Sequence, residues 1–216
     1  MGTVSKLSRY WLEKEIESYA GKLPANSVVL DAGGGACVYK KIFAHCQYES
    51  ADFAQMSGLQ YGKLTYVCDL TKIPVEGERY DFILFTQVLE HVPGPELVLR
   101  ELLRVLKPTG RIFCSAPVLY HEHGAPYDFY RYTQFGLRHL FAKSGFNIEK
   151  IDRMEGFFLT CAYLLEFIND GLPGHKIAKI IFSHYKKLFL KLEMKNKIAD
   201  KGLPINYIVV ATKPGN

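Results

Sequence analysis

Seven residues at positions 31–37, DAGGGAC, join a carboxylate to three consecutive glycines directly after the apolar run VVL. Glycine loses more backbone entropy on folding than any other residue, so such a run must meet a specific need. That need is a turn with unusual backbone angles or the close approach of a ligand. Glycines that follow a strand are where adenosine-containing ligands meet the backbone of α/β proteins. The sequence therefore predicts a ligand-binding turn, with a tight turn that binds nothing as the alternative.

The spacing of these glycines separates two classes of cofactor. The dinucleotide fingerprint GxGxxG would need glycines at 33, 35 and 38, but the third position is Val38. The chain also contains no GxSxG and no GxxxxGK[ST] sequence, so hydrolases and P-loop NTPases lose their main support.

Composition is that of a protein with a sizeable core, since 48% of the 216 residues are hydrophobic and 23% are charged. The five cysteines include no CxxC pair, which predicts reduced thiols in an intracellular compartment. The N-terminus has no apolar segment typical of a secretory signal. The longest apolar run, 157–168, is interrupted by Glu166 and is too short to span a bilayer. We therefore expect a cytoplasmic protein.

Short β-rich runs alternate with helical patterns along the chain. Strands are predicted at 27–32, 47–53, 64–70, 80–86, 110–117, 147–154 and 204–213. Helices are predicted at 4–22, 36–45 and 133–146, with another that starts at Pro95 and ends before Pro108. This alternation indicates a parallel sheet covered on both faces, with ligands bound at the carboxyl ends of its strands.

Four separated motifs then fall in one order: VVLDAGGGA, SADF, VCDL and TQVLEHVPGPELVLRELLRVLKPTGRI. From about Ser27 to Ile151 the chain resembles class I S-adenosylmethionine-dependent methyltransferases. It is most similar to the bacterial small-molecule type related to the ubiquinone and menaquinone methyltransferases. The resemblance implies a Rossmann-like, seven-stranded, mostly parallel sheet with helices on both faces and an antiparallel last strand. It also implies S-adenosylmethionine as the cofactor.

The resemblance assigns cofactor roles to the first two motifs. Asp31 would orient the loop and the methionine end of the cofactor, and Gly33 and Gly35 would let the backbone approach it. Asp52 would bind the ribose hydroxyls, because one carboxylate can accept from both. Taken alone, Asp52 could equally be a turn residue. Cys37 stands where the family usually has a third glycine, and a thiol at a helix N-terminus could instead be reactive.

The later motifs complete the implied cofactor pocket. Asp69 would hold the adenine amino group and Leu70 would lie against the ring, although Asp69 alone could be a strand-end cap. Gln87 and Val88 would line the pocket after the fourth strand.

The stretch HEHGAPYDFYRYT at 121–133 follows the fifth strand, so the fold places it beside the transferred methyl group. Its tyrosine rings with their hydroxyl groups, and one pair of opposite charges, could form a wall that excludes water and binds substrate. The residues concerned are Tyr127, Asp128, Tyr130 and Arg131. The alternative is a packing plug in which Asp128 and Arg131 pair locally.

A hydroxyl acceptor usually needs a general base, whereas a neutral amine does not. His121 and His123 are the first candidates and His91 the next, because imidazole titrates near neutrality. Taken alone, His91 could be a structural hydrogen-bonding residue. His121 and His123 could instead bind a metal, but no third ligand stands at a useful spacing, so no metal is predicted.

Positive charge gathers near the C-terminus, where residues 175–201 hold eight lysines against Glu193 and Asp200, a local charge of 8 − 2 = +6. Ile181, Tyr185 and Leu188 fall on one side of the predicted helix, opposite lysines. The segment can simply pack on the domain with its lysines in water. It can also rest on an anionic membrane through 175–195, or form a lid or dimer contact. No arginine stripe with interleaved aromatics supports nucleic-acid binding.

These observations predict one methyltransferase domain over 1–216. Its parts are an N-terminal helix (1–26), a cofactor-binding core (27–156), a basic helical insertion (157–201) and a final strand (202–216). The predicted activity is methyl transfer from S-adenosylmethionine to an O or N atom of a small or lipid-linked molecule. The alternatives are a nicotinamide-dependent reductase and a non-catalytic module that binds an adenosyl ligand or a membrane surface. Oligomeric state is not predicted.

Overall fold

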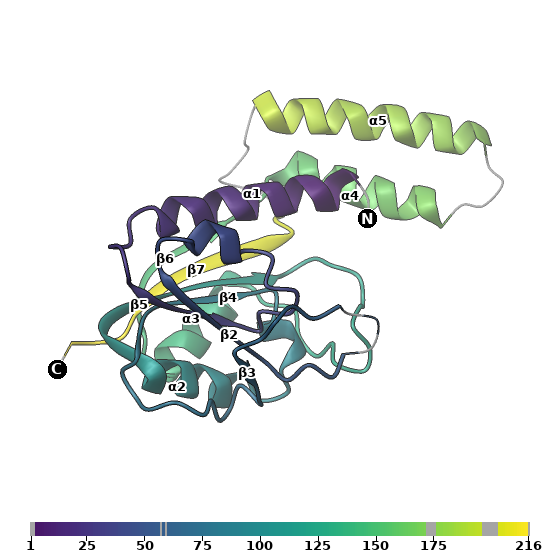
Figure 1. Cartoon of the computed structure of the whole chain (residues 1–216). Coiled ribbons are helices and arrows are strands. Elements are labelled where there is room, and N and C mark those ends of the chain that lie inside the picture. Colours follow the sequence, from purple (N-terminus) through teal and green to yellow (C-terminus); the bar gives the residue numbers. More distant parts are fainter. Residues whose placement is uncertain (1–2, 57, 59, 172–175, 196–202, 216) are drawn as a thin grey trace. The chain divides into compact units, whose positions relative to one another are not determined.

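The computed structural model describes residues 3–56, 58, 60–171, 176–195 and 203–215. Seven strands form one sheet in the order β3-β2-β1-β4-β5-β7-β6, with the last strand antiparallel (Figure 1). The strands are β1 Val28–Ala32, β2 Gln47–Asp52, β3 Tyr66–Val67, β4 Tyr80–Thr86, β5 Leu106–Pro117, β6 Asn147–Arg153 and β7 Asn206–Thr212. This order confirms the predicted Rossmann-like α/β fold.

The helices are α1 Thr3–Ala20, α2 Pro95–Val105, α3 Gln134–Lys143, α4 Phe157–Asp170 and α5 Lys176–Lys195. Two short 3₁₀ helices, η1 Lys40–Phe43 and η2 Leu89–His91, lie in the connections after β1 and β4. The chain divides into two compact units. The larger comprises 16–152 and 207–216, and the smaller comprises 1–15 and 153–206. Every residue predicted to bind cofactor or substrate lies in the larger unit.

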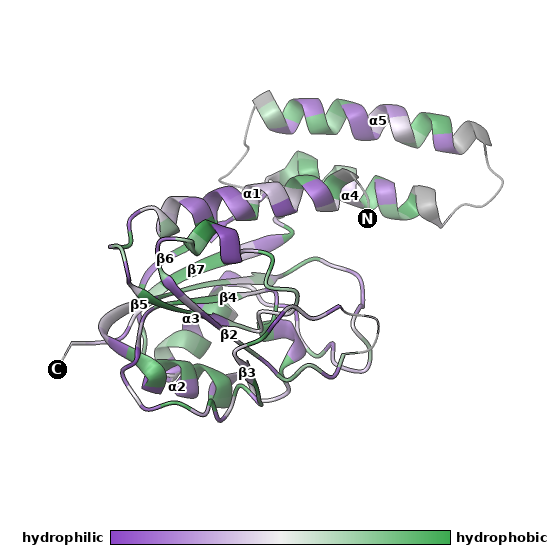
Figure 2. Ribbon diagram, viewed as in Figure 1, coloured by the Kyte–Doolittle hydropathy of each residue, from purple (hydrophilic) through white to green (hydrophobic). Residues whose placement is uncertain are grey.

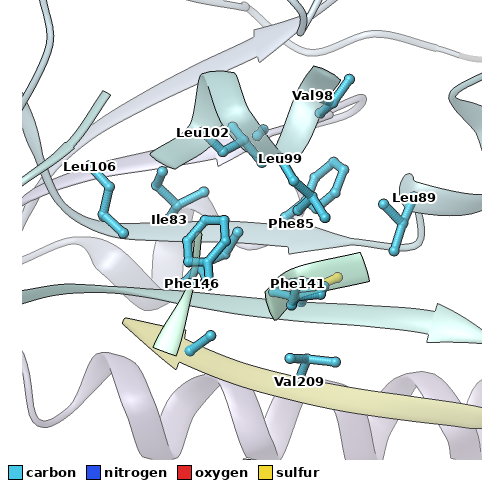
Figure 3. Packing of buried hydrophobic residues seen from close by; sticks show 14 of the residues in the cluster. Ile83, Phe85, Leu89, Val98, Leu99, Leu102, Leu106, Phe141, Phe146 and Val209 are labelled. Carbon is cyan, nitrogen blue, oxygen red and sulfur yellow. The ribbon is translucent and has the colours of Figure 1, made fainter. Parts of the chain in front are cut away.

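Strand β4 shows how the sequence builds the two faces of the sheet. Ile83 and Phe85 point to the face covered by α2, where Leu99 and Leu102 are fully buried (Figure 3). Phe82 points to the other face, where its ring lies 6.0 Å from that of Phe43 in η1. Because both faces are covered, β4 is apolar along nearly its whole length, as parallel strands are.

The helix predicted at 36–45 is wrong. The structure has turns there, followed by the single 3₁₀ turn of η1. The backbone of Gly35 has φ +48° and that of Cys37 has φ +54°, and two left-handed residues so close together prevent an α-helix from starting. The amide of Cys37 instead donates to the carbonyl of Gly34 and closes a tight turn. Cys37 therefore does not stand at a helix N-terminus.

The strand predicted at 64–70 is also largely wrong, since only Tyr66–Val67 pairs with β2. This strand lies at the edge of the sheet, where short strands are common.

Packing on α2 gives a direct test of this core. Leu99→Ala removes a fully buried side chain and should lower the free energy of unfolding by about 2–5 kcal/mol, measured by urea denaturation. Leu97→Ala on the same helix is the control, because Leu97 is 59% exposed and its loss should change stability by less than about 0.5 kcal/mol. Equal losses for the two variants would contradict the described packing of α2.

Candidate functional site

Three of the predicted cofactor residues lie at the carboxyl ends of neighbouring strands. Asp31 stands near the carboxyl end of β1, and Asp52 ends β2, which pairs in parallel with β1. Gln87 follows β4, the parallel partner of β1 on its other side. The structure therefore brings together side chains that lie up to 56 residues apart in the sequence.

The glycine turn depends on a close contact with the residue that follows β4. Gly33 has φ +75°, and a Cβ atom built on it would lie 2.2 Å from Cγ2 of Val88. Only glycine fits this position. The amides of Gly33 and Gly34 donate to the carbonyl of Ala51, which ties the turn to the end of β2.

Gly35 is different, because the space beside it is open. It also has positive φ, yet a Cβ atom there would approach nothing closer than the carbonyl oxygen of Gly33 at 4.0 Å. Its amide donates to Oδ2 of Asp52 at 3.0 Å, and the amide of Ala54 donates to Oδ1 at 2.9 Å. The turn thus presents bare backbone beside a carboxylate, which fits a ligand that carries adjacent hydroxyl groups.

Asp31 lies beneath this turn and is almost fully buried. Burial raises the pKa of its carboxyl to about 6, the Tyr48 hydroxyl partly offsets this by donating to Oδ2, and the negative charge of Asp52 raises the pKa further. The sequence analysis did not identify Tyr48 as a partner. In the parallel pairing of β1 with β2, Asp31 pairs with Ser50, and Tyr48 lies two residues before Ser50 on the same face of β2.

The remaining predicted cofactor residues have local partners. Asp69 is exposed, and its Oδ1 accepts from the amide and the hydroxyl of Thr71, so this carboxylate forms the strand-end cap given above as an alternative. Leu70 is buried in the main core. Gln87 has φ +56° and donates from Nε2 to the hydroxyl of Ser115 at 3.0 Å.

The loop at 121–133 is held together by one charged pair. Asp128 accepts from both terminal nitrogens of Arg131 at 2.7 and 2.8 Å. Arg131 also donates to the backbone carbonyls of Tyr120 and His121. Hydrogen bonding to Arg131 lowers the pKa of Asp128 well below its ordinary value. These contacts make Asp128 and Arg131 the internal frame of the loop, as in the local-pair alternative.

Two tyrosines predicted to bind substrate also anchor this loop. Tyr127 packs edge-on against Phe53, with ring centroids 5.3 Å apart, and Tyr130 donates from its hydroxyl to the carbonyl of Pro93 at 3.0 Å. Tyr130 is 39% exposed, so its ring still offers a surface to a ligand.

The three histidines have different surroundings. His91 contacts the carbonyl of Tyr127 through Nδ1, which must donate there because a carbonyl only accepts. Its Nε2 faces Oε1 of Glu90 at 3.8 Å. His121 is exposed and stacks on Tyr120 at 4.4 Å.

His123 is half-buried, and its ring meets that of His91 edge-on, with centroids 4.7 Å apart. Its Nδ1 contacts the carbonyl of His121 at 3.1 Å and must donate there, so Nε2 carries the lone pair of the neutral ring. Burial lowers the pKa of His123, and the contact with His121 only partly opposes this. Neutral imidazole is the form that can accept a proton.

Glu90 is the residue that the sequence analysis did not single out. Its side chain is fully buried, and neither carboxylate oxygen has a hydrogen-bond partner. Burial raises its pKa to about 8, partly opposed by the positive charge of Arg131. A carboxyl in this setting is neutral at pH 7. The signal in the sequence is its position between the core residue Leu89 and His91, in a run that otherwise reads as apolar.

Glu90, His91 and His123 each place one polar atom within 4.8 Å of the others, a spacing at which a metal ion could be held. The sequence analysis lacked a third partner for its histidines, and the structure supplies Glu90 in place of His121. Nδ1 of His91 is already engaged by Tyr127, so only Nε2 of that ring faces the group.

Comparison with known proteins places this site in context. A model of the family described as "Methyltransferase domain" matches residues 5–151. A ubiquinone biosynthesis O-methyltransferase of Coxiella burnetii is 23% identical over 150 residues, covering 69% of this chain and 57% of that protein. A demethylmenaquinone methyltransferase of Oceanobacillus iheyensis is 30% identical over 128 residues, covering 58% of this chain and 47% of that protein. The chain thus spans less than two thirds of these relatives.

Solved structures share the fold. Phosphoethanolamine N-methyltransferase 2 of Haemonchus contortus, in complex with S-adenosyl-L-methionine, superposes with a TM-score of 0.58 and 17% identity. The match covers 94% of this chain and 52% of that one. At this identity the likeness shows the fold alone.

The buried carboxyl of Glu90 predicts a pH-dependent stability. The folded chain keeps this proton up to about pH 8, whereas the unfolded chain releases it near 4.5. Between these values the folded state binds more protons, so its stability falls as pH rises. Glu90→Gln mimics the neutral carboxyl and should remove this fall. Relative to wild type, the variant should gain on the order of 3 kcal/mol between about pH 5 and about pH 8, measured by urea unfolding.

Glu122→Gln is the matched control, because it removes an exposed carboxylate from the neighbouring loop. Its stability should follow that of wild type across the same pH range. A Glu90→Gln variant that loses stability in parallel with wild type would mean that Glu90 is not held neutral in the folded chain.

Proposed function

Because the chain belongs to the methyltransferase domain family, we propose that it transfers the methyl group of S-adenosylmethionine to an oxygen or nitrogen atom of a small or lipid-linked acceptor. By family and fold it is a class I S-adenosylmethionine-dependent methyltransferase, and S-adenosylmethionine is its cofactor. This assignment, together with Val38 in place of the third glycine, replaces the nicotinamide-dependent alternative.

The observation that carries the proposal is the open cradle at Gly35. Its bare backbone and the Asp52 carboxylate lie side by side at the carboxyl ends of β1 and β2, where open α/β sheets bind ligands. Asp52 would accept from the ribose hydroxyls, and Asp31 would hold the turn from below. Asp69, Leu70 and Gln87 would complete the pocket, as the resemblance implies.

Bound S-adenosylmethionine supplies an electrophilic methyl group on a sulfonium. Alignment of donor and acceptor is then the main task left to the protein. We assign the 121–133 loop to this task, because Asp128 and Arg131 hold it through two hydrogen bonds and its aromatic rings can exclude water.

For a hydroxyl acceptor we assign His123 as the general base. It would take the hydroxyl proton at Nε2 while the new bond from oxygen to the methyl carbon forms and the bond from that carbon to sulfur breaks. His91 donates from Nδ1 to the carbonyl of Tyr127 and its Nε2 faces the buried Glu90, and His121 is exposed, so both are weaker candidates. An amine acceptor would need none of the three.

The relatives' names motivate the first acceptors to screen. One is a ubiquinone biosynthesis O-methyltransferase and another a demethylmenaquinone methyltransferase. Phenolic quinone precursors are therefore screened beside primary and secondary amines, with radiolabelled methyl transfer as the measurement.

With a hydroxyl acceptor, His123→Gln should lower kcat by about 10²–10⁴-fold, with little change in S-adenosylmethionine binding. His139→Gln, which changes an exposed histidine on α3, is the control and should keep full activity. Transfer to a hydroxyl acceptor that survives in His123→Gln would remove the base assignment. Cofactor binding without transfer to any acceptor would favour the non-catalytic alternative.

A further inference from the structure

The smaller unit exposes two apolar stripes that nothing in the described chain covers. One lies on α4 and one on α5, and their main members are 41–49% exposed although they are large and apolar. They are Phe157, Leu164 and Ile168 on α4, and Ile181, Tyr185 and Leu188 on α5. Apolar segments are visible along both ribbons in Figure 2.

The contacts between the two helices fix their relative direction. Glu193, near the end of α5, accepts from the amide of Gly156, just before α4. Further along α4, Phe158 stacks on Phe189 with ring centroids 6.0 Å apart. Because later residues of α4 meet earlier residues of α5, the helices form an antiparallel hairpin (Figure 1).

Both stripes lie on the same side of this hairpin. On α5, Lys186 and Phe189 contact α4. Tyr185 stands one residue before Lys186, and Leu188 stands one residue before Phe189. On α4, Phe157 likewise precedes Phe158. One residue is a rotation of about 100°. In antiparallel helices this rotation turns both stripes toward the same side, so they form one continuous apolar face, here called the outer face.

On α4, the side opposite the outer face is packed. Leu159, Ala162 and Tyr163 of α4 are buried, and the amide of Val4 in α1 donates to Glu166. The outer face therefore has no role in holding the smaller unit together.

Charge on α5 is strongly positive, with six lysines against Glu193. Lys187 and Lys191 of α5 are exposed, and Lys179 is half-buried. The acid of α5, Glu193, is 1% exposed and occupied by the amides of Gly156 and Leu159. The rest of the predicted basic segment, including residues 196–201, lies outside the described residues.

We propose that the outer face of the α4–α5 hairpin docks on an anionic lipid bilayer. The apolar outer face would enter the acyl chains, while the lysines on the remaining surface of α5 would meet anionic headgroups. A second copy would also bury the outer face, but it would leave these lysines without groups of opposite charge. No helix in the described part of the chain is long and apolar enough to cross a membrane.

The test is flotation with vesicles of phosphatidylcholine alone or mixed with phosphatidylglycerol. Wild type should bind only the anionic vesicles, and less at high salt. Lys187→Gln and Lys191→Gln should each weaken binding about fivefold. Leu188→Ser should weaken it at least as much, because it removes an exposed side chain from the outer face.

Matched controls come from the larger unit. Lys72→Gln removes an exposed lysine and Phe135→Ser an exposed aromatic ring that is 72% exposed, and both should bind vesicles like wild type. Wild type that ignores anionic vesicles overturns the proposal. A dimer in sedimentation that Leu188→Ser converts to a monomer, without vesicle binding, would assign the outer face to a second copy. Neither result bears on methyl transfer, which is assayed without lipid.

Discussion

The contact between Val88 and the bare Cα of Gly33 is the constraint on which the rest of the site depends. It joins the residue after β4 to the turn after β1, two strands that neighbour each other in the sheet. Any side chain at Gly33 would push these segments apart. With the turn held there, the amide of Gly35 donates to Asp52 at the end of β2. The absence of a side chain at Gly33 thus lets the ends of β1, β2 and β4 come together.

Burial and hydrogen bonding determine which carboxyl groups of the site are charged. Asp31 lies under the glycine turn and accepts a hydrogen bond from Tyr48. Glu90 lies under the 121–133 loop, and its carboxyl has no hydrogen-bond partner. Burial alone costs an ionised carboxylate several kcal/mol, so Glu90 keeps its proton while Asp128, bonded to Arg131, remains charged. The site therefore holds a neutral carboxyl at Glu90 beneath a loop that carries the charged Asp128–Arg131 pair.

Sequence pattern predicted the sheet well because burial on both faces leaves a clear signal, as the apolar run of β4 shows. The hydrophobic pattern could not show that 36–45 is not a helix. The helix is absent because Gly35 and Cys37 have positive φ, and cysteine seldom adopts positive φ. The cofactor residues at strand ends were recognisable by family motif. Glu90 stands beside His91 in the same motif, but its lack of a hydrogen-bond partner could not be predicted, because it depends on how η2 packs beneath the 121–133 loop and not on any neighbour in sequence.

Calorimetric titration of S-adenosylmethionine into wild type, Gly35→Ala and Gly58→Ala tests the central claim most directly. Both glycines have positive φ and open space, so each substitution should cost a similar backbone strain of about 1 kcal/mol. Only Gly35 lies in the proposed cradle. We predict that wild type and Gly58→Ala bind alike, while Gly35→Ala binds at least about tenfold more weakly with similar thermal stability. Equal binding by all three, or none by wild type, would contradict the account.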